Sequence, residues 1–170
     1  MIGRPDTSEL DEYQNAYVSN VRGDNIVAFL QQQLEEASRL LASLPEEKGS
    51  YRYGLDKWSI KELVGHMSDS ERVFAYRTLA FSRNDSNALP GFDQDVWAKN
   101  ANHVNVPLRD VVAEFENVRR STLDLLRQFD AAAWTRRGTA NNRPISVHAL
   151  TFLIGGHAEH HLQILKSRYL

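Results

Sequence analysis

Apolar residues recur at steps of three and four along four separate stretches of this chain, a repeat that admits few folds other than a helical one. In the first stretch they are Ile26, Leu30, Leu34, Ala37, Leu41 and Leu44. Steps of three and four place side chains on one face of a helix. The pattern predicts main helices at about 24–44, 59–82, 108–129 and 146–168, and a short helix near 93–100.

The signals at the ends of these stretches agree with the helical repeat. Ser59 and Glu62 have the spacing of a capping box, and Pro107 suits a first helical turn. Residues 1–22 are polar and have only weak periodicity. We therefore expect an N-terminal arm that packs late in folding or onto a neighbouring molecule. Residues 23–170 then form a single all-α domain, a four-helix bundle with a short extra helix in the middle loop.

Composition narrows the classes of function. The chain has 20 Lys and Arg against 22 Asp and Glu, with mixed signs along its length, which disfavours nucleic acid as a partner. No apolar run is long enough to span a bilayer, so we expect a cytoplasmic protein without a membrane partner. Because the chain has no cysteine, any metal must be bound by His and carboxylate side chains.

The histidines carry the clearest chemical signal. His157 and His161 are four residues apart, so both imidazoles leave the same helical face and can converge on one ion. His66 lies on the second helix near apolar neighbours and is a plausible third donor. Each has a simpler interpretation: His66 as a hydrogen-bonded core residue, and the pair as a solvated helix end. Spacing alone leaves both interpretations open.

Two further features bear on the histidine pair. Gly155 and Gly156 lie inside an otherwise well-formed helix. Each glycine lowers helix stability by roughly 1 kcal/mol relative to Ala. Glycines at such positions indicate close approach of another helix or a ligand. Simple tight packing explains them equally well. The segment does not match the H-E-x-x-H pattern, because Glu159 lies two residues after His157, and this disfavours a metalloprotease.

Three ordered motifs resemble the DinB-like superfamily, which includes YfiT-type proteins. They are Trp58-Ser59-x-x-Glu62-Leu63-x-x-His66, the segment from Pro90 to Trp97 (Pro-Gly-Phe-Asp-x-Asp-x-Trp), and Gly156-His157-x-x-His160-His161. The likeness extends from about Asp24 to Leu170. It implies an up-up-down-down four-helix bundle with one divalent metal ion on His66, His157 and His161. It also implies that His160 and His148 are not ligands.

The resemblance implies a range of activities rather than one. Characterised relatives include transferases and isomerases that use a low-molecular-weight thiol, such as bacillithiol, mycothiol or glutathione. We therefore expect a metal-dependent thiol S-transferase with a small-molecule substrate. A non-catalytic metal-binding or stress-related interaction protein is the alternative, and a metal-dependent hydrolase is the third. For imidazole ligands, Ni²⁺ and Zn²⁺ are the expected ions.

Other residues have weaker expected roles. Nearby carboxylates are candidates to orient the ligands, two tryptophans to wall a pocket, and three arginines to receive an anionic cosubstrate, although surface or core roles explain them as well. They are Asp69, Glu71, Asp93 and Asp95; Trp58 and Trp97; and Arg136, Arg137 and Arg143. An apolar stripe in the arm, at Leu10, Tyr13, Tyr17 and Val18, either covers its own bundle or supports a homodimer, and we expect the homodimer.

Overall fold

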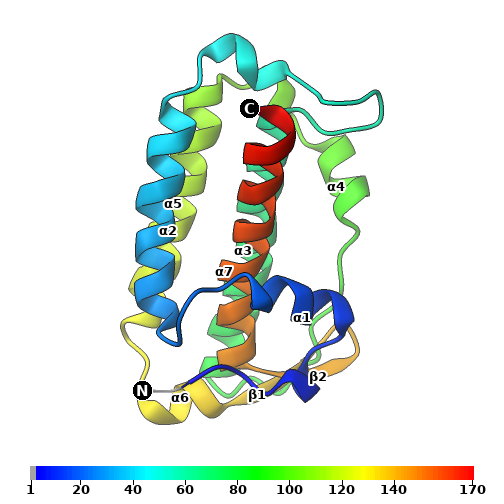
Figure 1. The fold of residues 1–170 in the computed structure, drawn as a ribbon. Coiled ribbons are helices and arrows are strands. Elements are labelled where there is room, and N and C mark those ends of the chain that lie inside the picture. The colour runs from blue at the N-terminus through cyan, green and yellow to red at the C-terminus, as the bar shows by residue number, and fades with distance from the viewer. Residues whose placement is uncertain (1–2) are drawn as a thin grey trace.

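The computed structural model describes residues 3–170, so Met1 and Ile2 of the predicted arm lie outside the described part. Four long helices form a bundle (Figure 1): α2 Ile26–Ala42, α3 Ile60–Ser82, α5 Leu108–Leu126 and α7 Val147–Ile164. The predicted four-helix bundle is confirmed, with ends within a few residues of those expected. The chain continues beyond α7 in a π-helical turn, Leu165–Tyr169.

The helix directions follow from the two connections that join the first three helices. The link between α2 and α3 stays at one end of the bundle, so these helices are antiparallel (Figure 1). The link between α3 and α5 runs back along the bundle and contains α4, Gln94–Asn100. As a result α3 and α5 both begin near Glu46, which binds Lys61 and the Leu108 amide. Helix α7 runs in the same direction as α2 (Figure 1). The four helices therefore run up, down, down, up, whereas the resemblance implied up, up, down, down.

A β-hairpin lies between the third and fourth predicted helices, where the sequence analysis expected no strand. Its strands are β1, Arg137–Ala140, and β2, Arg143–Ser146, and they pair antiparallel. Asn141 and Asn142 join them with φ of 50° and 62°. Two consecutive residues with positive φ are typical of a type I′ hairpin turn, which Asn tolerates well. Short helical elements complete the fold: η1 Thr7–Glu9, η2 Glu46–Ser50, η3 His103–Asn105 and α6 Ala131–Thr135.

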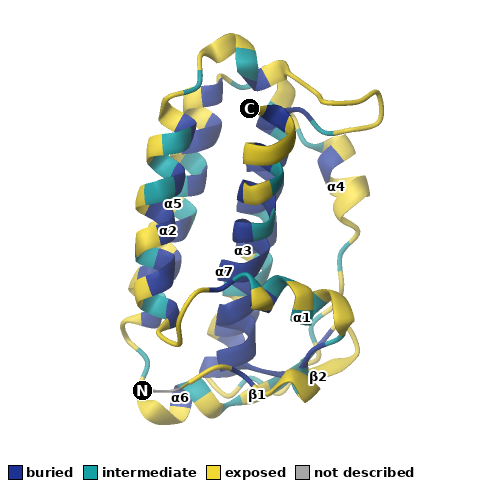
Figure 2. Cartoon of the chain, in the orientation of Figure 1, coloured by how far each residue is buried: buried dark blue, intermediate teal, exposed yellow. Residues whose placement is uncertain are grey.

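Helix α7 is the most deeply buried element of the bundle. All but a few of its residues are buried, whereas α2 and α5 alternate buried and exposed faces (Figure 2). A helix surrounded on several sides can hold polar side chains away from water, and four of the six histidines lie on it. Within residues 3–170, no helix combines the length and the apolar character needed to cross a membrane.

The N-terminal arm contains a helix, α1 Glu12–Ser19, which lies across α7 (Figure 1). A capping box between Asp11 and Gln14 begins this helix. Leu10 and Val18 are buried in the core of the same chain, while Tyr13 is 80% exposed. The arm therefore covers its own bundle with most of its apolar stripe.

Candidate metal centre

Three histidines from two helices meet inside the bundle. His66 comes from α3, and His157 and His161 come from successive turns of α7. The Nε2 atom of His157 lies 3.1 Å from Nε2 of His66 and 3.1 Å from Nε2 of His161. All three donor atoms lie within 4.8 Å of one another, and all three residues are buried. The structure thus assembles the three residues that the resemblance implied as ligands.

The spacing of these nitrogen atoms fits one shared ion. Two ligands that each lie about 2.0–2.1 Å from a zinc ion are themselves about 3 Å apart. A neutral imidazole has one N–H, so Nε2 of His157 cannot donate to both of its neighbours. A cation shared among the three nitrogens would satisfy all of them together. The donor set is therefore suited to a divalent transition metal.

Burial keeps these imidazoles in the form that binds metal. Desolvation lowers the pKa of His66 to about 4. The pKa of His161 is lowered to about 3, and that of His157 well below its usual range. Desolvation is the larger cause for both residues, and repulsion from the neighbouring imidazoles is the smaller one. The three rings are accordingly neutral near pH 7, with lone pairs available for a cation.

Two aromatic side chains enclose the histidine cluster. The Trp58 ring lies 4.6 Å from the His66 ring and 6.4 Å from the His161 ring, between centroids. Tyr17, from the arm, meets the His157 ring edge-on at 5.4 Å. Trp58, which was expected to wall a pocket, packs against two of the clustered imidazoles. The contribution of Tyr17 was missed, because nothing in the sequence places α1 beside α7.

A hydroxyl group, and not one of the four expected carboxylates, contacts a ligand candidate from behind. Ser70 Oγ lies 3.4 Å from Nδ1 of His66, one helical turn away. Within residues 3–170, none of the four carboxylates proposed for this role hydrogen-bonds to these imidazoles. Glu71 pairs with Arg119, Asp69 with Arg72, Asp93 caps α4, and Asp95 is exposed. Ser70 could have been found from its four-residue spacing to His66.

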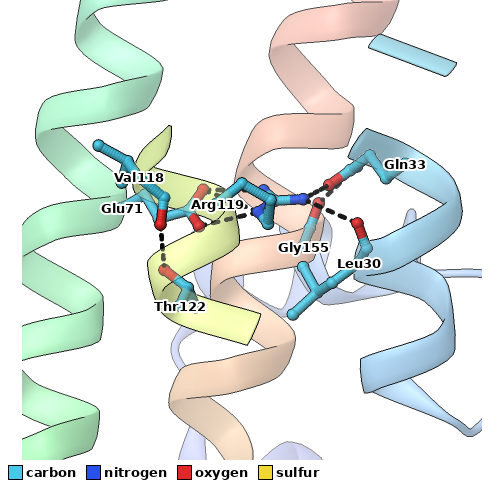
Figure 3. Close-up of polar contacts among 7 residues, drawn as sticks. All are labelled: Leu30, Gln33, Glu71, Val118, Arg119, Thr122 and Gly155. Carbon is cyan, nitrogen blue, oxygen red and sulfur yellow. Dashed lines mark hydrogen bonds and ion pairs between the residues drawn. The ribbon is translucent and has the colours of Figure 1, made fainter. Parts of the chain in front are cut away.

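A buried polar network lies beside the cluster and joins all four long helices (Figure 3). Arg119 on α5 binds both carboxylate oxygens of Glu71 on α3, and its Nη1 donates to Oε1 of Gln33 on α2 at 2.8 Å. Gln33 in turn donates to the Gly155 carbonyl and to Glu159, both on α7. The network fixes α3 and α7 relative to each other where they present the histidines.

A cavity of about 230 Å³ reaches the cluster at His157. Tyr17, Ser70, Phe74, Arg77 and Arg143 are among its other lining residues. It lies between α1, α3, α7 and the hairpin, so the arm and the hairpin form walls that the four long helices alone would lack. The cavity therefore places open space beside one of the three candidate ligands, His157.

The remaining expected residues lie around this site or away from it. Arg143 lines the cavity and pairs with Asp11, whereas Arg137 pairs with Glu9 and Arg136 donates to the Ser82 carbonyl. Trp97 is 43% exposed, stacks on Phe92 and lines a separate surface cavity. His160 and His148 are not in the cluster, as the resemblance implied.

Comparison with known proteins agrees with this geometry. The profile of the DinB superfamily matches residues 30–165, which include all three clustered histidines. The chain belongs to the DinB superfamily. Two relatives of this chain are named as candidate metal-dependent hydrolases. The one from Oceanobacillus iheyensis is 27% identical over 73% of this chain and 72% of its own length. The one from Geobacillus thermodenitrificans is 27% identical over 75% of this chain and 74% of its own length.

Two solved structures share the fold. YfiT from Bacillus subtilis, described as a probable metal-dependent hydrolase with an unusual four-helix bundle topology, matches with a TM-score of 0.71. It is 15% identical, and the match covers 96% of this chain and 89% of YfiT. A mycothiol-dependent maleylpyruvate isomerase matches with a TM-score of 0.63 at 12% identity, over 93% of this chain and 62% of the isomerase. At these identities the likeness concerns the fold alone.

Proposed function

We propose that this DinB-superfamily protein is a metal-dependent hydrolase of a small molecule, with His66, His157 and His161 as the metal ligands. The observation that carries the proposal is the convergence of three neutral Nε2 atoms beside a cavity that His157 also lines. A divalent ion bound there would supply Lewis acidity, polarising a substrate carbonyl group and acidifying a water molecule.

The chain's own residues would prepare the site for that chemistry. Ser70 is placed to accept a hydrogen bond from Nδ1 of His66, which fixes the ring and leaves Nε2 free to face the ion. Trp58 and Tyr17 exclude water from two sides of the cluster. The network through Arg119 and Gln33 fixes the helices that carry the ligands.

Two observations favour hydrolysis over the thiol transfer first expected. The cavity of about 230 Å³ is smaller than the roughly 300–1,000 Å³ of common ligand pockets. It accommodates a small substrate and water more readily than a thiol cosubstrate together with an electrophile. The two sequence relatives are also named as candidate metal-dependent hydrolases.

Thiol S-transfer to a small electrophile is the second candidate. The observation in its favour is the shared fold with an isomerase named as mycothiol-dependent. Because this chain has no cysteine, the sulfur would have to arrive on a low-molecular-weight thiol. A non-catalytic metal-binding protein is the remaining alternative.

Two parallel assays separate the three functions. Protein without a His-tag, loaded with Zn²⁺ or Ni²⁺, is incubated with a panel of small esters and amides, and separately with monochlorobimane plus glutathione, bacillithiol or mycothiol. We expect metal-dependent hydrolysis that is lost in His157→Ala and kept in His148→Ala. Thiol conjugation without hydrolysis would support the second candidate. Stoichiometric metal without turnover in either assay would support the non-catalytic alternative.

A further inference from the structure

A single arginine in the cavity beside His157 has no acidic partner. Arg77 is 6% exposed, and its Nη2 donates to the Pro90 carbonyl at 2.6 Å. Within the described residues, no carboxylate oxygen lies within 4.0 Å of its guanidinium group. A buried cation without a counter-ion is costly, and proteins pair almost all such groups.

The other charged groups lining this cavity are already neutralised. Glu9 pairs with Arg137 at 3.0 Å and accepts a hydrogen bond from the Ser146 amide. Arg143 pairs with Asp11 at 3.2 Å. The cavity therefore has an excess of one positive charge, and Arg77 carries it. Burial also lowers the pKa of Arg77, with no acidic group opposing the effect.

Arg77 lies on the same side of α3 as the candidate metal ligand. His66, Ser70, Phe74 and Arg77 follow one another at steps of four, four and three, which places them along one helical face. The Phe74 ring lies 5.8 Å from the His157 ring and 6.0 Å from the guanidinium carbon of Arg77. One aromatic ring therefore separates the cation from the histidine cluster.

We propose that the cavity binds a small molecule carrying a carboxylate group, and that Arg77 receives this group while the reacting bond lies toward the histidine cluster. This inference rests on the proposed function and names its substrate class. One unpaired positive charge matches a carboxylate, whereas a phosphate monoester carries close to two negative charges at neutral pH. Arg77 has four N–H donors left after the bond to Pro90, enough for a two-point contact.

The rest of the lining specifies an apolar body for the substrate. Phe74, Phe92, Ile145, Leu150 and Leu153 face the same space. An arginine beside aromatic and aliphatic side chains suits a short acid with a hydrocarbon or aromatic portion. Suitable probes are acetate, benzoate and 3-phenylpropionate, each compared with its primary amide, which has a similar shape and no charge.

The test measures equilibrium binding of these acids and amides to full-length, metal-free protein by calorimetry at pH 7.5. We expect at least one acid to bind about tenfold or more tightly than its amide. We expect Arg77→Gln to weaken binding of that acid to the level of the amide. Arg83→Gln, at the exposed end of the same helix, should leave binding unchanged.

Two results would overturn the proposal. One is the absence, in the wild-type protein, of any acid that binds more tightly than its amide. The other is acid binding in Arg77→Gln equal to that of the wild type. The wild-type comparison is decisive even if Arg77→Gln does not fold. Because the measurement uses metal-free protein, it is independent of metal binding and turnover, so failure of the proposed hydrolase activity would not be mistaken for failure of the carboxylate site.

Discussion

The Tyr17 peptide group lies directly against Gly156. A Cβ atom added at Gly156 would overlap the carbonyl group of Tyr17, which is backbone and cannot rotate away. The arm can therefore lie across α7 only because position 156 has no side chain. This contact places the Tyr17 ring against His157, the next residue along α7.

Gly156→Ala should therefore destabilise the protein although alanine favours helices. We expect a loss of about 1–3 kcal/mol in the free energy of unfolding, as for overpacked cores, measured by urea denaturation. Gly155→Ala is the matched control. Its Cβ would meet the side chains of Phe29 and Ile26 at 3.1–3.2 Å, so we expect a change within about 1 kcal/mol, partly offset by helix propensity. Equal effects of the two substitutions would contradict this account.

The helices and the histidine pair could be predicted from the sequence because both depend on local spacing. The apolar repeat predicted all four long helices, and the capping box at Ser59 is present as expected. The four-residue interval between His157 and His161 fixes their common face whatever surrounds the helix. Selecting His66 as the third donor depended on the family resemblance, since periodicity allows many residues on α3 to point inward.

The walls of the site could not be predicted, because long-range packing determines them. The hairpin was missed since Arg136 to Pro144 combines charged and turn-forming residues without a strand-like alternation. Tyr17 and Arg77 belong to the site only because α1 and the loop near Pro90 lie against it. The sequence makes Glu71 a candidate to orient a ligand, but Arg119, which is distant in the sequence, pairs with it instead.

The metal content of the protein should depend on the three clustered histidines and not on the total number of histidines in the chain. We expect close to one Zn²⁺ or Ni²⁺ per chain in protein purified without a His-tag, measured by elemental analysis. His157→Ala removes the central nitrogen and should abolish loading, while His148→Ala should retain it. At a free metal concentration of 100 times Kd, binding should stabilise the folded wild type by about 2.7 kcal/mol. Equal metal retention in both variants would disprove the ligand assignment.

Acidification should destabilise the protein in part through His148. Burial lowers the pKa of this residue, and the Gly3 carbonyl and Glu9 only partly oppose that effect. Its ring packs on Trp134 and Phe152. Between its folded-state pKa and the ordinary value near 6.5, the unfolded chain binds more protons, so the free energy of unfolding falls as pH falls.

The check is urea denaturation at pH 7.5 and pH 5.5 for the wild type and His148→Gln. Because glutamine does not titrate, the variant should lose less stability between the two pH values than the wild type. The same loss in both proteins would show that His148 does not contribute to the acid sensitivity.

The homodimer remains a prediction, and the structure changes what is expected of the arm. Leu10 and Val18 are buried within their own chain, which leaves the exposed Tyr13 as the main apolar side chain that the arm can offer to a partner. Light scattering across micromolar concentrations should give twice the 19.4 kDa of one chain if the dimer forms. A mass that stays at 19.4 kDa would rule it out. Tyr13→Ser tests the arm without removing its buried residues.

The adjacent residues Arg119 and Arg120 should differ sharply in their contributions to stability. Arg119 is fully buried and binds Glu71, so replacing it with glutamine leaves a buried carboxylate without its partner. We expect a loss of about 3–5 kcal/mol in the free energy of unfolding. Arg120 pairs with Glu116 on the helix surface, and Arg120→Gln should cost less than about 1 kcal/mol.

The Arg119 substitution should also weaken metal binding, because the network that it breaks fixes α3 and α7 where they carry His66 and His157. The affinity for Zn²⁺, measured by competition with a chelating dye at a temperature where both variants remain folded, should fall in Arg119→Gln and stay constant in Arg120→Gln. A folded Arg119→Gln variant with wild-type zinc affinity would show that the network supports the bundle without positioning the histidines.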